Sequence, residues 1–161
     1  MSCIVCATRG GEGSRAVQLA AIERAKELGK DLVFLFVADA VVQERVEEKL
    51  RTAVRDELVW MGNAMLQIAR LRAEAREIDV QLKIRVGHVR EEITQFLRES
   101  QADLLLLGAP RGTTTTVFGD DAIEKFAHSI QEVTNIDVEV IRPEAVEHLT
   151  RLPRLDTRFS R

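Results

Sequence analysis

The chain of 161 residues lacks any apolar run approaching the roughly 18 residues that a membrane-spanning helix needs. Its first residues, MSCIVCATRGG, also lack the basic start and the apolar core of a signal peptide. An excess of positive charge is absent too, because the formal net charge is −3. We therefore expect a cytoplasmic protein that has neither a membrane nor a nucleic acid as partner.

Cysteine is scarce, and the two cysteines, Cys3 and Cys6, are separated by two residues. A four-ligand zinc site would need a second pair, which the chain does not contain. Redox pairs usually lie where a helix begins, whereas these lie in a strand-like run, SCIVCAT. On a strand, side chains three residues apart point to opposite faces, so the two thiols should diverge. We interpret both as buried structural residues.

Signals for β-hairpins are absent as well, and short apolar runs instead alternate with longer helical patterns. This alternation predicts one α/β domain: an open, parallel, five-stranded sheet with helices on both faces and right-handed crossovers. The expected strands span residues 3–8, 31–37, 79–87, 103–108 and 137–143.

The helical segments carry more specific expectations. The first is expected to begin with Ser14 as its cap, to end at Gly29, and to bury one stripe: Val17, Ala21, Ala25 and Leu28. Residues 41–78 are helical in character over an unusual length. Gly62 is the only interior breaker, which predicts a break into two helices near 55–63. Trp60 and Met61 lie beside that break, and we assign both to the core. The alternative is that they cover a ligand crevice.

The last 18 residues differ from the rest of the chain. Residues 144–161 contain four arginines, are interrupted by Pro153 and have little apolar content. We divide the chain into a domain of residues 1–143 and a C-terminal tail of residues 144–161. A frayed tail is the simpler interpretation, and a segment that docks on a partner subunit is the alternative.

Four stretches together resemble the universal stress protein family, across roughly residues 2–142. They are GS at the opening of the first helix, LFVAD (35–39), VGHVREEITQFLRESQADLLLLGAPRG (86–112) and VTNIDVEVIRP (133–143). The resemblance implies a Rossmann-like fold, similar to the adenine nucleotide alpha hydrolases, with strand order 3-2-1-4-5. It also implies a homodimer built around the last strand. Some members of the family hold ATP at the carboxyl ends of the strands, and others do not.

Three segments should meet at that crevice: residues 7–14, 37–40 and 108–121. Phosphate binding needs glycines, whose backbone N–H groups can point at oxygens, in front of a helix N-terminus. The nucleotide-binding members of the family space their glycines G-x2-G-x9-G and follow them with Ser or Thr. Here the gaps between Gly108, Gly112 and Gly119 are three and six residues, and Asp120 replaces the hydroxyl.

A carboxylate repels a phosphate unless a cation such as Mg²⁺ lies between them. The acid that family members place after the first strand is also missing, since Thr8 and Arg9 occupy that turn, whereas Val37 matches the position whose backbone contacts adenine. Arg111 and the threonines 113–116 offer a guanidinium and hydroxyls for an anion. The candidate nucleotide-binding residues are therefore Thr8, Val37, Gly108, Arg111, Gly112, Thr113, Gly119 and Asp120. The alternative is a solvated loop followed by a helix cap at Asp120.

These observations lead to competing functional hypotheses. The first is a regulatory module of the family that binds ATP, another adenine nucleotide or some other phosphate-bearing ligand, with Mg²⁺ as a candidate companion ion. The second is a dimeric interaction protein that binds no nucleotide. A catalyst is not expected, because no base, nucleophile or metal-ligand cluster stands out, although slow ATP hydrolysis stays open.

Overall fold

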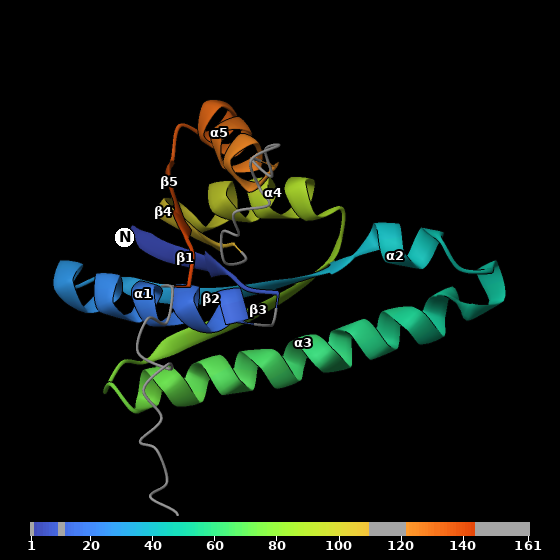
Figure 1. Cartoon of the computed structure of the whole chain (residues 1–161), viewed down its shortest axis with the longest axis horizontal. Helices are drawn as coiled ribbons and strands as arrows, with labels where there is room; N and C mark the ends of the chain where they lie inside the picture. The colour runs from blue at the N-terminus through green and yellow to red at the C-terminus, as the bar shows by residue number, and fades with distance from the viewer. Residues whose placement is uncertain (1, 10–11, 110–121, 144–161) are drawn as a thin grey trace, which may run out of the picture.

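The computed structural model describes residues 2–9, 12–109 and 122–143, and its strands form one parallel sheet of order β3-β2-β1-β4-β5 (Figure 1). The predicted fold class and strand order are confirmed. The strands are β1 (Cys3–Ala7), β2 (Asp31–Asp39), β3 (Val80–Gly87), β4 (Ala102–Gly108) and β5 (Asp137–Ile141). The helices are α1 (Glu12–Leu28), α2 (Ala40–Glu44), α3 (Arg51–Glu74), α4 (Val89–Ser100) and α5 (Ala122–Thr134), with a 3-10 turn, η1 (Glu48–Leu50), before α3.

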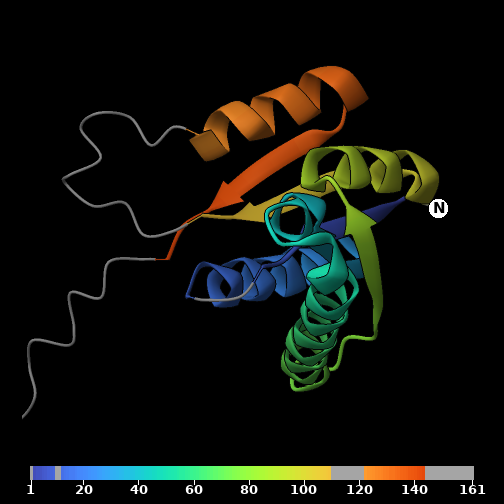
Figure 2. The same ribbon diagram turned by 90° about the vertical axis from the view of Figure 1, so that its right-hand side faces the viewer.

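The helices cover the sheet in two layers, with α1 and α3 on one face and α4 and α5 on the other (Figure 2). Apart from Asp31, Asp39 and Asp103, the side chains of the central strands β1, β2 and β4 are apolar, as expected where helices cover both faces of a sheet. Strand β3 lies at an edge and alternates between exposed and half-buried residues, as its sequence predicts. Among the described helices, none is long and apolar enough to cross a membrane.

The two cysteines of β1 lie on opposite faces of the sheet, as predicted. Cys6 packs in the cluster beneath α1 and α3, and Cys3 packs in the cluster beneath α4 and α5. Both are free and buried, and burial raises the pKa of each thiol. High thiol pKa values and divergent directions make them structural residues.

Helix α1 ends as expected but does not begin as expected. Gly29 terminates it with a φ of +61°, a conformation that favours glycine, and Lys30 N–H bonds back to the Ala25 carbonyl at 3.1 Å. The helix already includes residue 12, so the prediction that Ser14 caps its start is wrong. The Ser14 hydroxyl instead accepts from the backbone N–H of Arg9 at 3.2 Å. Leu28, the last residue of the predicted stripe, is 49% exposed.

The predicted break at 55–63 is also wrong, because α3 runs through Gly62 without interruption. The interruption lies earlier, in residues 45–47 between α2 and η1. Gly62 faces β2: a Cβ built on it would stand 2.3 Å from Cδ1 of Phe36. The glycine is therefore a packing position inside a helix, where its missing side chain admits an aromatic ring from the sheet.

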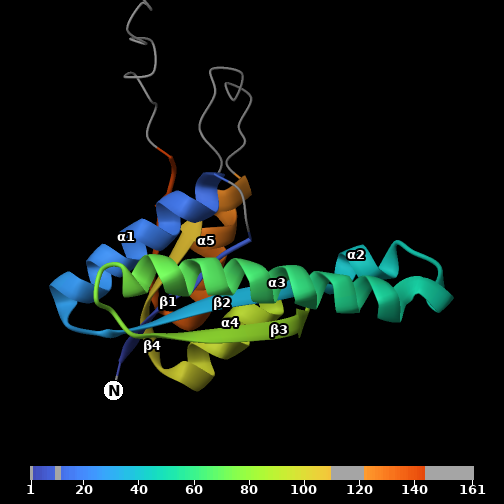
Figure 3. The same ribbon diagram turned by 90° about the horizontal axis from the view of Figure 1, so that it is seen from below.

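The assignment of Trp60 and Met61 to the core is wrong. Trp60 is 68% exposed and Met61 is 48% exposed. The buried residues of α3 are Gly62, Leu66, Ala69 and Ala73, which follow the helical period on its sheet-facing side. By the helical period, Trp60 and Met61 point away from that side. In Figure 3 no described segment lies over the outer side of α3.

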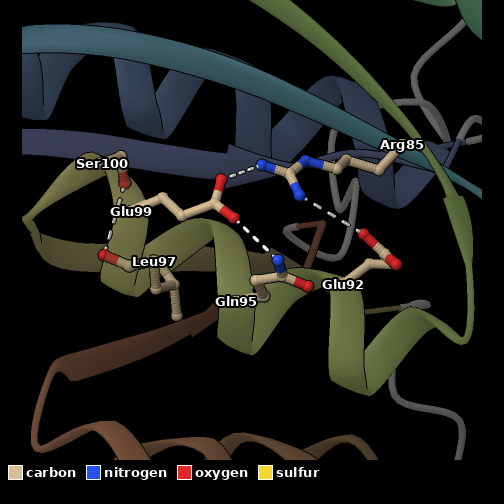
Figure 4. Close-up of polar contacts among 6 residues, drawn as sticks. All are labelled: Arg85, Glu92, Gln95, Leu97, Glu99 and Ser100. Carbon is tan, nitrogen blue, oxygen red and sulfur yellow. Dashed lines mark hydrogen bonds and ion pairs between the residues drawn. The ribbon is translucent and has the colours of Figure 1, made fainter.

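A polar cluster fastens α4 to the edge strand β3 (Figure 4). The guanidinium of Arg85 donates to the carboxylate of Glu99 and lies 3.6 Å from that of Glu92. Gln95 Nε2 also donates to Glu99, at 2.8 Å, and the Arg85 guanidinium lies 5.3 Å from the ring centre of Phe96. The hydrogen bond from Arg85 lowers the pKa of Glu99 most, and the hydrogen bond from Gln95 lowers it further.

Candidate functional site

A cavity of about 390 Å³ lies at the carboxyl ends of β1, β2 and β4, on the side of the sheet covered by α4 and α5. Strand β1 pairs with β2 on one side and β4 on the other, so the direction of the strand order reverses at β1. Ligand crevices of open parallel sheets lie at such a reversal. The cavity therefore occupies the position where the sequence places the crevice.

The base of the cavity is apolar. Six large side chains line it, from two strands on one side and from α4 and α5 on the other: Leu35, Val37, Leu107, Ile93, Ile123 and Phe126. All six belong to the hydrophobic cluster on that face of the sheet. An apolar slot of this size suits a planar ring system, because burying such a ring removes apolar surface from water.

Three charged residues line the same cavity: Arg9 after β1, Asp39 at the end of β2, and Arg142 after β5. The Asp39 carboxylate accepts from the backbone N–H of Val41 at 2.9 Å and thereby caps α2. Arg142 forms an ion pair with Glu124 of α5. Two guanidiniums beside an apolar slot suit a ligand with an apolar body and an anionic group.

Thr8 lines the cavity, but its hydroxyl is held on the opposite face of the sheet. It accepts from Gln18 Nε2 at 2.8 Å, and Gln18 Oε1 in turn accepts from Arg72 of α3. The Thr8 side chain is 2% exposed, and its backbone N–H donates to the Leu35 carbonyl at 2.9 Å. The Thr8 hydroxyl therefore serves the packing of β1, α1 and α3.

Gly108 lines the cavity and also has a packing role that the sequence analysis did not identify. A Cβ built on Gly108 would stand 2.9 Å from the Gly13 carbonyl oxygen and 3.0 Å from Val17 Cγ1. A Cβ on Gly13 would likewise stand 2.7 Å from the Ala109 carbonyl oxygen. The two glycines let the first turn of α1 approach the end of β4 closely. A substitution at Gly108 would therefore disturb packing as well as any ligand.

The remaining predicted residues, Arg111, Gly112, Thr113, Gly119 and Asp120, lie outside the described residues. Two described residues close to this segment, Gly108 before it and Ala122 directly after it, line the cavity.

Asp39 and Arg142 were not predicted as site residues, and Arg9 was predicted only as an occupant of the first turn. A signal for all three was present, since each stands at or just after the carboxyl end of an expected strand. Within the described residues, no group of three or more His, Cys, Asp or Glu side chains is placed to hold a metal ion.

The fold and its crevice define an open parallel α/β protein with a cavity at the switch in strand order. Residues 1–142 match the universal stress protein family, and the chain belongs to that family. The comparison with curated proteins gives no match.

Solved structures support the fold at low sequence identity. The universal stress protein UspA from Lactobacillus plantarum is 15% identical, with 88% of this chain and 97% of that chain covered and a TM-score of 0.71. A universal stress protein family protein from Arabidopsis thaliana with AMP bound is 12% identical, with coverage of 91% and 95% and a TM-score of 0.63. The universal stress protein from Archaeoglobus fulgidus in complex with dAMP is 16% identical, with coverage of 88% and 98% and a TM-score of 0.56.

Proposed function

We propose that this chain is a cytoplasmic regulatory module, rather than a catalyst, that binds an adenine nucleotide or another phosphate-bearing ligand in the crevice. The observation that carries the proposal is the combination in one cavity of an apolar base with Arg9 and Arg142. Relatives in the same family that hold AMP or dAMP support it.

The ring of the ligand would lie against Val37 and Leu107, and its phosphates would lie toward the two arginines and the 110–121 segment. Val37 would contact the ring through its backbone. Thr8 would take part through its backbone carbonyl, because its hydroxyl accepts from Gln18 and its N–H donates to Leu35. Arg111, Gly112, Thr113 and Gly119 would surround the phosphates together with Gly108.

Mg²⁺ enters this proposal through Asp120. A carboxylate beside a phosphate is repulsive, and a divalent cation between them reverses the sign of that interaction. A ligand with several phosphates, such as ATP, would then bind more tightly with Mg²⁺, whereas AMP would depend on it less.

Thermal unfolding of the full chain with ATP, ADP, AMP and inorganic phosphate, each with and without Mg²⁺, tests the proposal. A ligand at about 100 times its dissociation constant should stabilise the folded chain by about 2.7 kcal/mol. Arg9→Gln and Arg142→Gln should each weaken nucleotide binding about tenfold through loss of a charge-assisted contact. The matched control is Arg90→Gln, an exposed position of α4. If none of these ligands raises the melting temperature at millimolar concentration, nucleotide binding is contradicted.

A second candidate function is a dimeric interaction protein that binds no nucleotide. The observation that favours it is that the Thr8 hydroxyl and Gly108 both serve internal packing. The dimer would form around β5, an edge strand that pairs only with β4 among the described strands. Val140→Asp should then reduce the mass in solution, whereas Val133→Asp, at an exposed position of α5, should not.

A further inference from the structure

Helix α3 has a second apolar side, which we call the outer stripe: Ala53, Trp60, Met61, Ala64, Ile68 and Leu71. All six residues are exposed, with Leu71 at 64% and Ile68 at 48%. From residue 60 the stripe repeats at intervals of three or four residues, as one face of a helix does. At 3.6 residues per turn, its centre lies roughly 160° around the helix from the buried Gly62, Leu66, Ala69 and Ala73.

This arrangement departs from that of an ordinary surface helix, whose outward side is polar. Five polar residues of α3 share a strip beside the outer stripe: Asp56, Asn63, Gln67, Arg70 and Glu74. One exposed charge, Glu57, lies within the stripe between Ala53 and Trp60. Single exposed apolar residues are common, but an uninterrupted apolar row such as that from Trp60 to Leu71 marks an interaction surface. In Figure 3, no described element lies over this side of α3.

We propose that the outer stripe pairs with the outer stripe of a second copy of this chain, in an antiparallel arrangement with a two-fold axis at Ala64. Ala64 is the small residue near the middle of the stripe, with Trp60 one turn before it and Ile68 one turn after it. A two-fold axis at Ala64 places Trp60 of one copy opposite Ile68 of the other. The small alanines at the crossing let the helices approach, and the large side chains close the contact on both sides.

The size of the stripe is sufficient for such a pair. From their exposure, its six residues expose on the order of 550 Å² per chain, so pairing would bury at most about 1,100 Å² in total. That upper limit reaches the roughly 1,000 Å² expected of a specific interface, and tryptophan and methionine are residues that interfaces favour. A two-fold contact uses the same patch on both copies, as a single stripe requires.

The proposed contact is independent of ligand binding and of pairing through β5. Helix α3 covers β2 and β3, whereas β5 is the opposite edge of the sheet. The two surfaces can therefore be occupied at the same time, and a test of the α3 contact needs a probe within α3.

Trp60 supplies that probe, because it is the only tryptophan of the chain. As the full chain is concentrated from nanomolar to tens of micromolar, the emission of Trp60 should shift to the blue, in step with doubling of the mass in sedimentation. If the emission of Trp60 stays that of a solvent-exposed indole at every protein concentration, the proposal is overturned. A blue shift that appears only when phospholipid vesicles are added would also overturn it, in favour of a membrane surface as the occupant.

Two neighbouring substitutions separate the stripe from the rest of the helix. Ile68→Glu places a charge in the proposed contact of both copies and should raise the dissociation constant of this pair a hundredfold or more. Gln67→Glu adds the same charge one residue away, on the polar strip, and should change it less than threefold. Equal effects of the two variants would contradict a contact through the outer stripe.

The two-fold axis is tested by cross-linking. Ala64→Cys would place the new thiols of two copies side by side, so mild oxidation should give a covalent dimer with intact folding. Asn63→Cys, on the polar strip, should give none, and the native thiols are buried in the folded chain. Equal cross-linking of both variants, or of neither, would overturn the antiparallel arrangement.

Discussion

The two faces of the sheet are covered by helices that differ in the size of their inward side chains. Toward the sheet, α1 and α3 present several small residues, Ala21, Ala25, Ala69, Ala73 and Gly62, beside larger ones such as Ile22 and Leu66. Helices α4 and α5 present larger ones, among them Ile93, Phe96, Leu97 and Ile130. Small residues let a helix approach the strands closely, as Gly62 does over Phe36. The cavity with the two arginines lies on the face with the larger side chains.

The same comparison applies to the outward sides of the helices. Helix α4 is apolar only toward the sheet, and its outer side carries charged and polar residues such as Glu91, Gln95 and Arg98. Helix α3 is apolar toward the sheet and again on the outer stripe. Under our two proposals, one face of this protein binds a small ligand and the other pairs with another chain.

The largest expected difference in stability is between removing the buried ring of Phe96 in α4 and removing the exposed ring of Trp60 in α3. Phe96 is 6% exposed and Trp60 is 68% exposed. Phe96→Ala should lower the free energy of unfolding by about 3–5 kcal/mol, because it empties core volume and removes the ring beneath Arg85. Trp60→Ala, measured by urea unfolding at a protein concentration that keeps the chain monomeric, should change it by less than about 0.5 kcal/mol.

A loss of several kcal/mol in monomeric Trp60→Ala would show that the outer stripe is covered within one chain. That result would remove the contrast between the two faces.

A smaller effect is expected from filling the space above Phe36. Gly62→Val would drive a side chain into the Phe36 ring and should destabilise the chain by about 1–3 kcal/mol, despite the poor helix propensity of glycine. Asn63→Val, at the next and exposed position, is the matched control and should be nearly neutral. Urea unfolding of both variants checks the prediction. Stabilisation by Gly62→Val would mean that α3 does not lie closely on the sheet.

The smallest effect concerns pH and the cluster that joins α4 to β3. The hydrogen bond from Arg85, and then that from Gln95, lower the pKa of Glu99 from its ordinary value of 4.5. A lowered folded-state pKa gives stability that is present above the unfolded value and is lost as the pH falls through the folded one. The free energy of unfolding of the wild type should therefore exceed that of Glu99→Gln at pH 7, and the difference should narrow as the pH falls below about 4.5.

The control compares Arg85→Gln with the double variant Arg85→Gln, Glu99→Gln. The difference between their free energies of unfolding should depend less on pH. If the difference in free energy of unfolding between wild type and Glu99→Gln stays constant from pH 3 to pH 7, Glu99 acts without its charge.

The sequence predicts most of this fold because periodicity reports which residues face a core. The buried runs of β2 and β4 and the single apolar side of α4 are examples. The same reasoning failed for α3, since apolar residues on two sides of one helix look like a longer core segment. Trp60 was therefore assigned to the core, and Gly62 was interpreted as a breaker because propensity does not show that Phe36 needs its space.

The candidate site was only partly predictable. The strand ends located the crevice, and Thr8, Val37 and Gly108 do line it. Sequence spacing does not tell on which face of the sheet a side chain finds its partner, so the engagement of the Thr8 hydroxyl by Gln18 was not foreseen. Arg142 was missed because its place beside the cavity depends on how β5 pairs with β4.

The most direct test of this division between the two faces is a map of backbone amide chemical shifts of the full chain during titration with AMP. The account predicts changes that saturate at Val37, Leu107, Ile123 and Phe126, with the amides of the outer stripe unchanged. Changes that centre on α3, or none at millimolar AMP, would contradict the account.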